Sequence, residues 1–242
     1  MPRPFLKAEW RKLAMANYLV DPALLLPYIP LKTELDFWTP PGDDRKRCFV
    51  SLVGFMFQNL RVKGVKIPFH VNFEEINLRF YVRCRNGETW KRGVVFIREI
   101  ASKPMVSLVA NTMFNEHYVT MPTEHSFIAS PGILNVEYRW KSSHWNVFGI
   151  ASEKTPVAIN PNSEEEFVLE NYIGYTKTGK GYSFEYLVEH PKWEVYPVRS
   201  YRLDVDFAGL YGEAFGFLSK EKPASVFLAE GSEIVVRNSM KI

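Results

Sequence analysis

The segment from residue 73 to residue 101 constrains the fold more than any other part of the chain. Residues 73–85 alternate between apolar and polar side chains, which is the period of a β-strand with two different faces. Asn86-Gly87 follows and favours a tight two-residue turn. A mostly apolar run then returns over residues 90–101. Together these features predict an antiparallel β-hairpin.

A further strand is predicted just before this hairpin. Residues 47–60 are apolar on both alternating sets of positions, with Phe49 and Phe57 on one set and Leu52 and Met56 on the other. Such a strand is expected where both faces of a sheet are covered by other elements.

Helices are expected to be few and short. An apolar stripe at helical spacing predicts one amphipathic helix over residues 103–116, which would pack on the sheet. Another short helix is predicted over residues 8–20. Ser163 and Glu166 form a capping box that would open a third helix. A last helical stretch is expected near residues 205–211.

The remaining segments favour short strands separated by turns. Aromatic residues make up 15% of the chain, and they support a β-rich core because they favour strands and cover large areas. We therefore predict one mostly β domain of the α+β kind over residues 1–242, built from curled antiparallel sheets with a few short helices packed on them. The further strands are expected at residues 125–150 (two or three strands), 172–176, 182–189, 193–203 and 225–237.

The charge balance argues against a nucleic-acid partner. Lys and Arg number 30 and Asp and Glu number 27, so the formal net charge is only +3. The densest basic stretch, Arg45 to Arg47, stands beside two aspartates and is typical of a solvated turn. A nucleic-acid-binding chain is expected to show a larger and more clustered positive charge.

We expect the protein to be cytoplasmic and to have no membrane partner. Residues 1–7 lack the apolar core of a secretory signal. The longest apolar stretch, near residues 49–57, is far shorter than the ~20 residues of a spanning helix. Cys48 and Cys84 are expected to be unpaired buried thiols, and a disulfide is expected only if the chain is exported.

Familiar catalytic and cofactor motifs are absent from the sequence. It contains no P-loop, no GxGxxG after a predicted strand, no GxSxG turn and no HExxH. His117 and His125 could meet across a turn, but a metal site there is not favoured because the histidines show no short ligand spacing. We therefore expect neither a metal nor a cofactor.

The polar face of the strand over residues 73–85 carries the main candidate site. In an open sheet this face would be an ordinary solvent-exposed surface. In a small barrel it would line the interior, where Glu75 and Arg79 could pair and orient a ligand. The sequence leaves both alternatives open. The row consists of Glu75, Asn77, Arg79, Tyr81 and Arg83.

Two charged residues, Arg98 and Glu99, stand near the end of the returning strand. Charged groups in an otherwise apolar strand need partners or a function. Because neighbours on a strand point to opposite faces, only one of the two joins the Glu75 face unless a bulge intervenes. We expect Glu99 to point inward and Arg98 to pair elsewhere, and both remain candidate ligand-binding residues.

Several segments resemble one known family. In chain order they are Asn72–Val82, Arg92–Ile100, Asn115–Tyr118, Val188–Trp193 and Ser225–Ser232. They resemble the YqjF-like family of uncharacterised bacterial proteins, which is grouped with the acetoacetate-decarboxylase-like superfamily. Glu116-His117 belongs to the third segment, and we expect it to have a structural role at a helix end. One departure is Asn171, which stands where relatives usually carry a histidine.

The resemblance implies a fold and a chemistry. The implied fold is an acetoacetate-decarboxylase-like barrel of curled sheets around an apolar cavity. In the decarboxylases a cavity lysine forms a Schiff base with a β-keto acid, and a second lysine depresses its pKa. Glu75 and the run Arg98–Ile100 match the decarboxylase pattern, whereas Met105 and Val106 stand where the lysine pair would be. The nearest lysine is Lys103, at the expected helix start.

Three functional hypotheses follow. The first is a protein whose cavity binds a small organic carboxylate or carbonyl compound, with Arg79 holding its oxygen and Glu75 as partner or general base. The second is a Schiff-base lyase or aldolase-type enzyme that uses Lys103, with Glu75 and Glu99 as the other catalytic candidates. The third is a structural or interaction protein with a filled barrel. The sequence indicates neither the ligand nor the oligomeric state.

Overall fold

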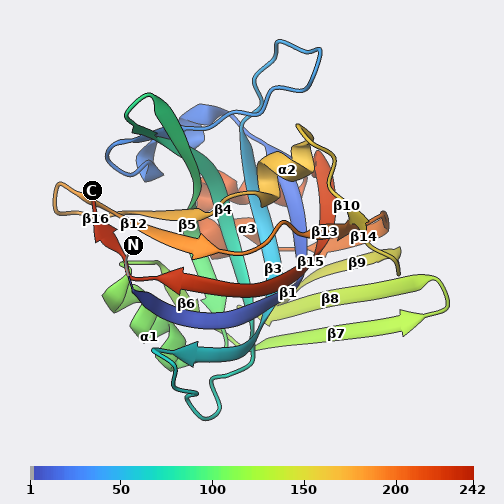
Figure 1. The fold of residues 1–242 in the computed structure, drawn as a ribbon. Helices are drawn as coiled ribbons and strands as arrows, with labels where there is room; N and C mark the ends of the chain where they lie inside the picture. The colour runs from blue at the N-terminus through green and yellow to red at the C-terminus, as the bar shows by residue number, and fades with distance from the viewer. Residues whose placement is uncertain (1–2) are drawn as a thin grey trace.

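Two curved β-sheets make up most of the structure, a computed structural model that describes residues 3–242 (Figure 1). The strands are β1 (Pro4–Leu19), β2 (Thr33–Leu35), β3 (Phe49–Val62), β4 (Phe73–Asn86), β5 (Thr89–Ala101), β6 (Tyr118–Thr120), β7 (Thr123–Ser130), β8 (Ile133–Lys141), β9 (Trp145–Glu153), β10 (Val157–Ala158), β11 (Ile173–Lys177), β12 (Ser183–Glu189), β13 (Glu194–Tyr196), β14 (Val198–Asp204), β15 (Ser225–Arg237) and β16 (Met240–Lys241). The helices are α1 (Pro104–Met113), α2 (Glu164–Leu169) and α3 (Phe207–Tyr211), with the 3-10 turns η1 (Pro22–Leu24), η2 (Leu26–Tyr28) and η3 (Glu213–Ser219).

The larger sheet closes into a barrel. Its strands follow the order β15-β1-β3-β4-β5-β11-β12, and β12 pairs again with β15 through Val188 and Val236. Neighbouring strands in this ring are antiparallel except β5 and β11, which meet in parallel where Val94 pairs with Gly174. Closure matters because it separates an inner face of the sheet from an outer one.

The smaller sheet, in the order β14-β9-β8-β7, packs on the outside of this barrel. One hydrophobic cluster fills the space between them, with Leu78 and Phe80 of β4 meeting Tyr138 and Phe148 of the second sheet. A second cluster lies inside the barrel and is rich in aromatic rings. The curled sheets and short helices predicted from the sequence are therefore confirmed.

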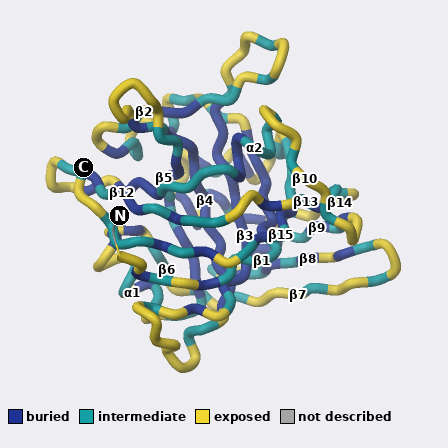
Figure 2. The backbone as a smooth tube through the Cα atoms, viewed as in Figure 1, coloured by how far each residue is buried: buried dark blue, intermediate teal, exposed yellow. Residues whose placement is uncertain are grey.

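The β-hairpin predicted around Asn86-Gly87 is present as β4 and β5. Gly87 has a φ of 63°, which a glycine adopts without strain. The two-sided strand is also confirmed, because β3 contributes Phe49 and Phe57 to the inner cluster and Leu52 and Met56 to the outer one. Burial on both faces is visible as dark blue along β3 and β4 in Figure 2.

The helix predicted over residues 8–20 is wrong, because this segment belongs to the sixteen-residue strand β1. Its Ala, Leu, Met and Lys content favours a helix locally. In the barrel, however, β1 pairs along most of its length with β3 and β15, and Leu13 through Asn17 are almost completely buried. Pairing and burial on both sides outweigh a weak local preference.

The helix predicted from the capping box and the amphipathic helix predicted from its apolar stripe are both present. The Ser163 hydroxyl accepts the backbone N–H of Glu166 and opens α2, which packs Phe167 against Tyr81 inside one end of the barrel. The helix α1 lies near the other end of the barrel strands (Figure 1). Cys48 and Cys84 are buried, unpaired thiols, as expected. Within residues 3–242 no helix has the length and apolar character needed to cross a membrane.

Candidate functional site

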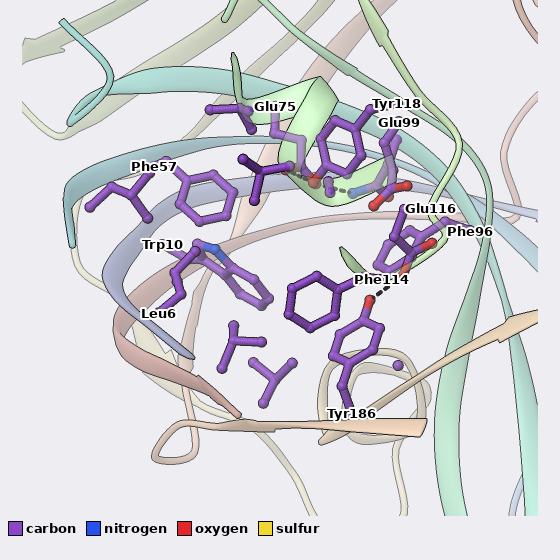
Figure 3. Close-up of a pocket in the computed structure, with 18 of the residues that line it drawn as sticks. Leu6, Trp10, Phe57, Glu75, Phe96, Glu99, Phe114, Glu116, Tyr118 and Tyr186 are labelled. Carbon is purple, nitrogen blue, oxygen red and sulfur yellow. Dashed lines mark hydrogen bonds between the residues drawn. The ribbon is translucent and has the colours of Figure 1, made fainter. Parts of the chain in front are cut away.

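A cavity of about 190 Å³ lies inside the barrel beneath α1. Its wall is mostly aromatic and aliphatic, and Figure 3 shows Trp10, Phe57 and Phe114 around the hollow. Polar side chains gather on one side, contributed by β4, β5, β12, the segment after α1 and the segment between α2 and β11. They are Glu75, Asn77, Arg79, Glu99, Glu116, Tyr118, Asn171 and Tyr186.

The polar row on β4 faces this cavity rather than solvent. Because β4 lies between β3 and β5 in a closed barrel, its odd-numbered residues point inward and its even-numbered residues point to the second sheet. Glu75, Asn77 and Arg79 are only 3%, 1% and 8% exposed and all line the cavity. The geometry therefore selects the interior alternative for these three residues. Arg83, at the far end of the row, is instead partly exposed and paired with Glu34.

A β-bulge in β5 brings Glu99 to the same side. Leu78 pairs with Arg98 while Arg79 pairs with Phe96, so Ile97 is an extra residue at this point. The extra residue allows both Phe96 and Glu99 to line the cavity. Arg98 turns outward, as expected, and donates to the carbonyl oxygen of Leu210.

Glu75 stands at the centre of a hydrogen-bonded group. Its carboxylate accepts from the Tyr118 hydroxyl at 2.5 Å and from the Asn77 side-chain amide at 3.1 Å. Burial raises the pKa of Glu75 to about 7, although the hydrogen bonds from Tyr118 and Asn77 and the charge of Arg79 oppose this rise. Near neutral pH, Glu75 can therefore either accept or donate a proton.

Glu116 forms a second buried carboxyl group in the cavity wall. It accepts from the Tyr186 hydroxyl at 2.7 Å and from the Thr176 hydroxyl at 3.0 Å, and Figure 3 shows Tyr186 pointing toward it. Burial raises its pKa to about 7 against these hydrogen bonds, and the charge of Glu75 adds to the rise.

Glu99 is the most strongly perturbed of the three carboxyl groups. Burial raises its pKa well above the ordinary value, and the charges of Glu116 and Glu75 raise it further. Its Oε2 atom is buried without a hydrogen-bond partner in the described chain. Such an environment favours the protonated form of a carboxyl group, which can act as a hydrogen-bond donor.

Arg79 supplies the positive charge of the site. Its Nη2 atom donates to the carbonyl oxygen of Val168 at 3.1 Å, while its Nε atom is buried with no partner among residues 3–242. Asn171 donates to the same carbonyl at 3.1 Å, and its own Oδ1 atom is also unpartnered. Asn171 therefore lies beside Arg79 and contributes an amide to the site.

Three residues predicted at the site do not line the cavity. The Tyr81 hydroxyl is hydrogen-bonded to Ser51 at 2.7 Å and its ring packs on Phe167. Arg98 points away, and Lys103 is the half-buried residue that precedes α1. The cavity wall does not include any of these three side chains, so their contact with a ligand stays a prediction from the sequence.

The sequence-based interpretation missed the role of Glu116. Its motif was noticed but was assigned to a helix end. Asn115, with a φ of 57°, turns the chain sharply after α1 and directs Glu116 into the barrel. Glu116 lies between α1 and β6, and its burial comes from apolar residues that are distant in sequence. Local sequence therefore gave no signal for its position in the cavity.

Met105 and Val106 of α1 are part of the cavity wall, and they are the positions where the resemblance implies a lysine pair. In the described chain no lysine lines the cavity. No group of three or more His, Cys, Asp or Glu side chains within residues 3–242 is arranged to hold a metal ion.

The fold defines the class of protein. The barrel and its second sheet are similar to the enduracididine biosynthesis enzyme MppR complexed with pyruvate, with a TM-score of 0.68 and 10% identity over 100% of this chain and 91% of that one. They are also similar to an acetoacetate decarboxylase, with a TM-score of 0.65 and 11% identity over 100% and 90% of the two chains. An acetoacetate-decarboxylase-like enzyme from Sphingomonas wittichii RW1 matches with a TM-score of 0.63 and 10% identity over 99% and 94%. The protein therefore has the acetoacetate-decarboxylase-like fold.

Within that fold class, the chain belongs to the DUF2071 family, described as an uncharacterized conserved protein, whose model matches residues 7–233. A comparison with curated proteins gave no match.

Proposed function

We propose that the barrel cavity binds a small organic molecule that carries a carboxylate or carbonyl group. The ligand oxygen would accept from Arg79, and its apolar remainder would pack against the aromatic wall. The observation that carries the proposal is the buried Arg79 side chain, which lines the cavity beside Glu75 and Asn77 and whose Nε atom has no hydrogen-bond partner in the described chain. Buried polar atoms of this kind are normally satisfied, so an unpaired charged donor in a cavity favours a ligand or water there.

The size of the cavity supports a small ligand. A dry cavity of roughly 150 Å³ in another protein accommodates benzene, so about 190 Å³ suits a molecule of comparable size or slightly larger. The similar fold of MppR, in its complex with pyruvate, supports the same class of ligand. Because likeness of fold does not establish function, the argument depends on the side chains of the cavity.

The three buried carboxyl groups set a condition on binding. A carboxylate ligand would be repelled by ionised Glu75, Glu99 and Glu116, but it is tolerated when they are protonated. Since Glu75 and Glu116 have pKa values of about 7, binding should be tighter below neutral pH than above it. The binding affinity of an uncharged carbonyl compound should depend less on pH.

Imine chemistry is not part of this proposal. Lys103 is not part of the cavity wall, whereas Met105 and Val106 of α1 are. We propose instead that Glu75 is the group placed to exchange a proton with a bound carbonyl compound, because its pKa is close to neutral. We also propose that residues 1–242 form one domain, which is supported by the pairing of β1 with β15 near the two chain ends. The motif resemblance noted in the sequence supports placing the chain in the bacterial YqjF-like branch.

Isothermal titration with pyruvate and with acetone, at pH 6 and pH 8, tests the proposal. Pyruvate is expected to bind more tightly at pH 6. Arg79→Gln is expected to weaken pyruvate binding about tenfold or more, because a charge-assisted hydrogen bond is lost. Arg83→Gln is the matched control, since Arg83 is on the same strand but pairs with Glu34 outside the cavity. Equal loss in both variants, or no saturable binding of either compound, would remove the basis of the proposal.

A further inference from the structure

Three segments at the mouth of the cavity contain basic residues and no acidic ones. We call residues 3–7, 61–72 and 103–115 the cavity rim. All three contribute to the cavity wall, for example through Leu6, Ile67 and Met105. Together they carry six Lys or Arg residues and no Asp or Glu, although the whole chain has 30 and 27. The positive charge of the protein is therefore concentrated on the rim. The six residues are Arg3, Lys7, Arg61, Lys63, Lys66 and Lys103.

The rim cations lack counter-charges. Lys7 on β1 lies directly opposite Arg61 on β3, and like charges facing each other across strands are destabilising. Four of the cations, Arg3, Lys7, Arg61 and Lys63, line one open groove beside the cavity. None of the six forms an ion pair within residues 3–242, and the Glu9 side chain on β1 is already hydrogen-bonded to Arg11 and Asn59.

The same rim exposes large apolar side chains. Phe69, in the loop between β3 and β4, is 88% exposed and has a φ of 65°, a conformation that is unfavourable for an aromatic residue. Val65 and Ile67 of the same loop are also exposed. The helix α1 has no charged residue over its whole length and exposes Met105, Leu108 and Met113. Figures 1 and 2 show this loop, α1 and the start of β1 at one end of the molecule, with the loop largely exposed.

We propose that the cavity rim docks on a membrane surface that contains anionic lipids. The exposed side chains of the 61–72 loop and α1 enter the head-group region, and the rim cations contact lipid phosphates. Single projecting apolar side chains surrounded by Lys and Arg are the pattern of proteins that lie on such surfaces. The proposal does not depend on the identity of the cavity ligand.

Charge favours an anionic lipid surface over a second copy of the chain as the partner of the cavity rim. Two rims brought together would place six cations against six, with no carboxylate on either side to compensate. An acidic protein could match the charge, but the apolar side chains project from separate segments, a loop and a helix, around an open cavity. A fluid lipid surface can accommodate such separate projections.

Vesicle co-sedimentation of the full chain tests the proposal. Vesicles of phosphatidylcholine alone are compared with vesicles of equal parts phosphatidylcholine and phosphatidylserine, at low and at physiological salt. The protein is expected to sediment with the anionic vesicles only, and less at higher salt. Lys63→Glu combined with Lys66→Glu is expected to weaken binding about tenfold or more. Phe69→Asn, which suits a positive φ, is expected to weaken it about fivefold or more.

Matched controls lie elsewhere on the surface. Lys154→Glu combined with Lys222→Glu changes the net charge equally, and Ile128→Asn removes an exposed apolar side chain from β7; both should bind like the parent protein. If a rim variant unfolds more easily, Lys63→Gln combined with Lys66→Gln takes its place. The proposal is overturned by equal binding to neutral vesicles, by rim variants that bind normally, or by self-association that Phe69→Asn abolishes.

Discussion

At the scale of single residues, the site depends on carboxyl groups whose pKa values are raised by burial. Glu75 and Glu116 have pKa values raised to about 7 by burial, whereas Glu74, their neighbour on the outer face of β4, has a pKa lowered to about 2. Burial raises the pKa of Glu74 too, but hydrogen bonds from His125 and Thr123 outweigh it. Adjacent residues on one strand thus have opposite pKa shifts, because burial prevails at Glu75 and hydrogen bonds prevail at Glu74.

These raised pKa values predict a pH-dependent stability. A carboxyl group whose pKa is higher in the folded state stabilises the fold fully below its unfolded pKa, near 4.5, and this contribution is lost as the pH rises through about 7. The free energy of unfolding in urea should therefore fall between pH 5 and pH 8. Glu116→Gln should reduce that fall. Glu74→Gln, the control, should lower stability at both pH values and leave the slope unchanged.

At the scale of elements, much of the architecture could be predicted from local sequence. The alternation in β4, the Asn86-Gly87 turn and the capping box of α2 are short-range signals, and all three are present in the structure. The strand β1 was predicted as a helix because its pairing partners, β3 and β15, lie far away in sequence. The inward direction of Glu75 and Arg79 depends on barrel closure, and the position of Glu116 depends on the turn at Asn115, so neither followed from periodicity.

The parallel contact between β5 and β11 should be a sensitive point of the barrel. A Cβ atom at Gly93 would lie 2.4 Å from the carbonyl oxygen of Ile173, a backbone atom that cannot move without shifting β11. Gly93→Ala should therefore reduce the free energy of unfolding by about 1–3 kcal/mol. Gly179→Ala, where nothing lies within 4 Å, should change it by less than about 0.5 kcal/mol. Equal effects in thermal or urea unfolding would argue against a tight β5–β11 contact.

At the scale of the whole molecule, barrel closure makes the site possible. The pairing of β12 with β15 encloses the inner face of β4, and α2 and α1 pack near the two ends. Without that enclosure the Glu75 row would be solvated, and its carboxyl groups would have ordinary pKa values. The pKa values of Glu75, Glu99 and Glu116 therefore report directly on whether the enclosed cavity exists in solution.

Carbon-13 NMR of the glutamate side-chain carboxyl groups measures these pKa values most directly. The signals are assigned with the variants Glu75→Gln, Glu99→Gln and Glu116→Gln. An enclosed chamber predicts that Glu75 and Glu116 titrate near pH 7 and that Glu99 titrates well above its ordinary range. If all three instead titrate near 4.5, as solvent-exposed glutamates do, the row faces water and the account of the site is wrong.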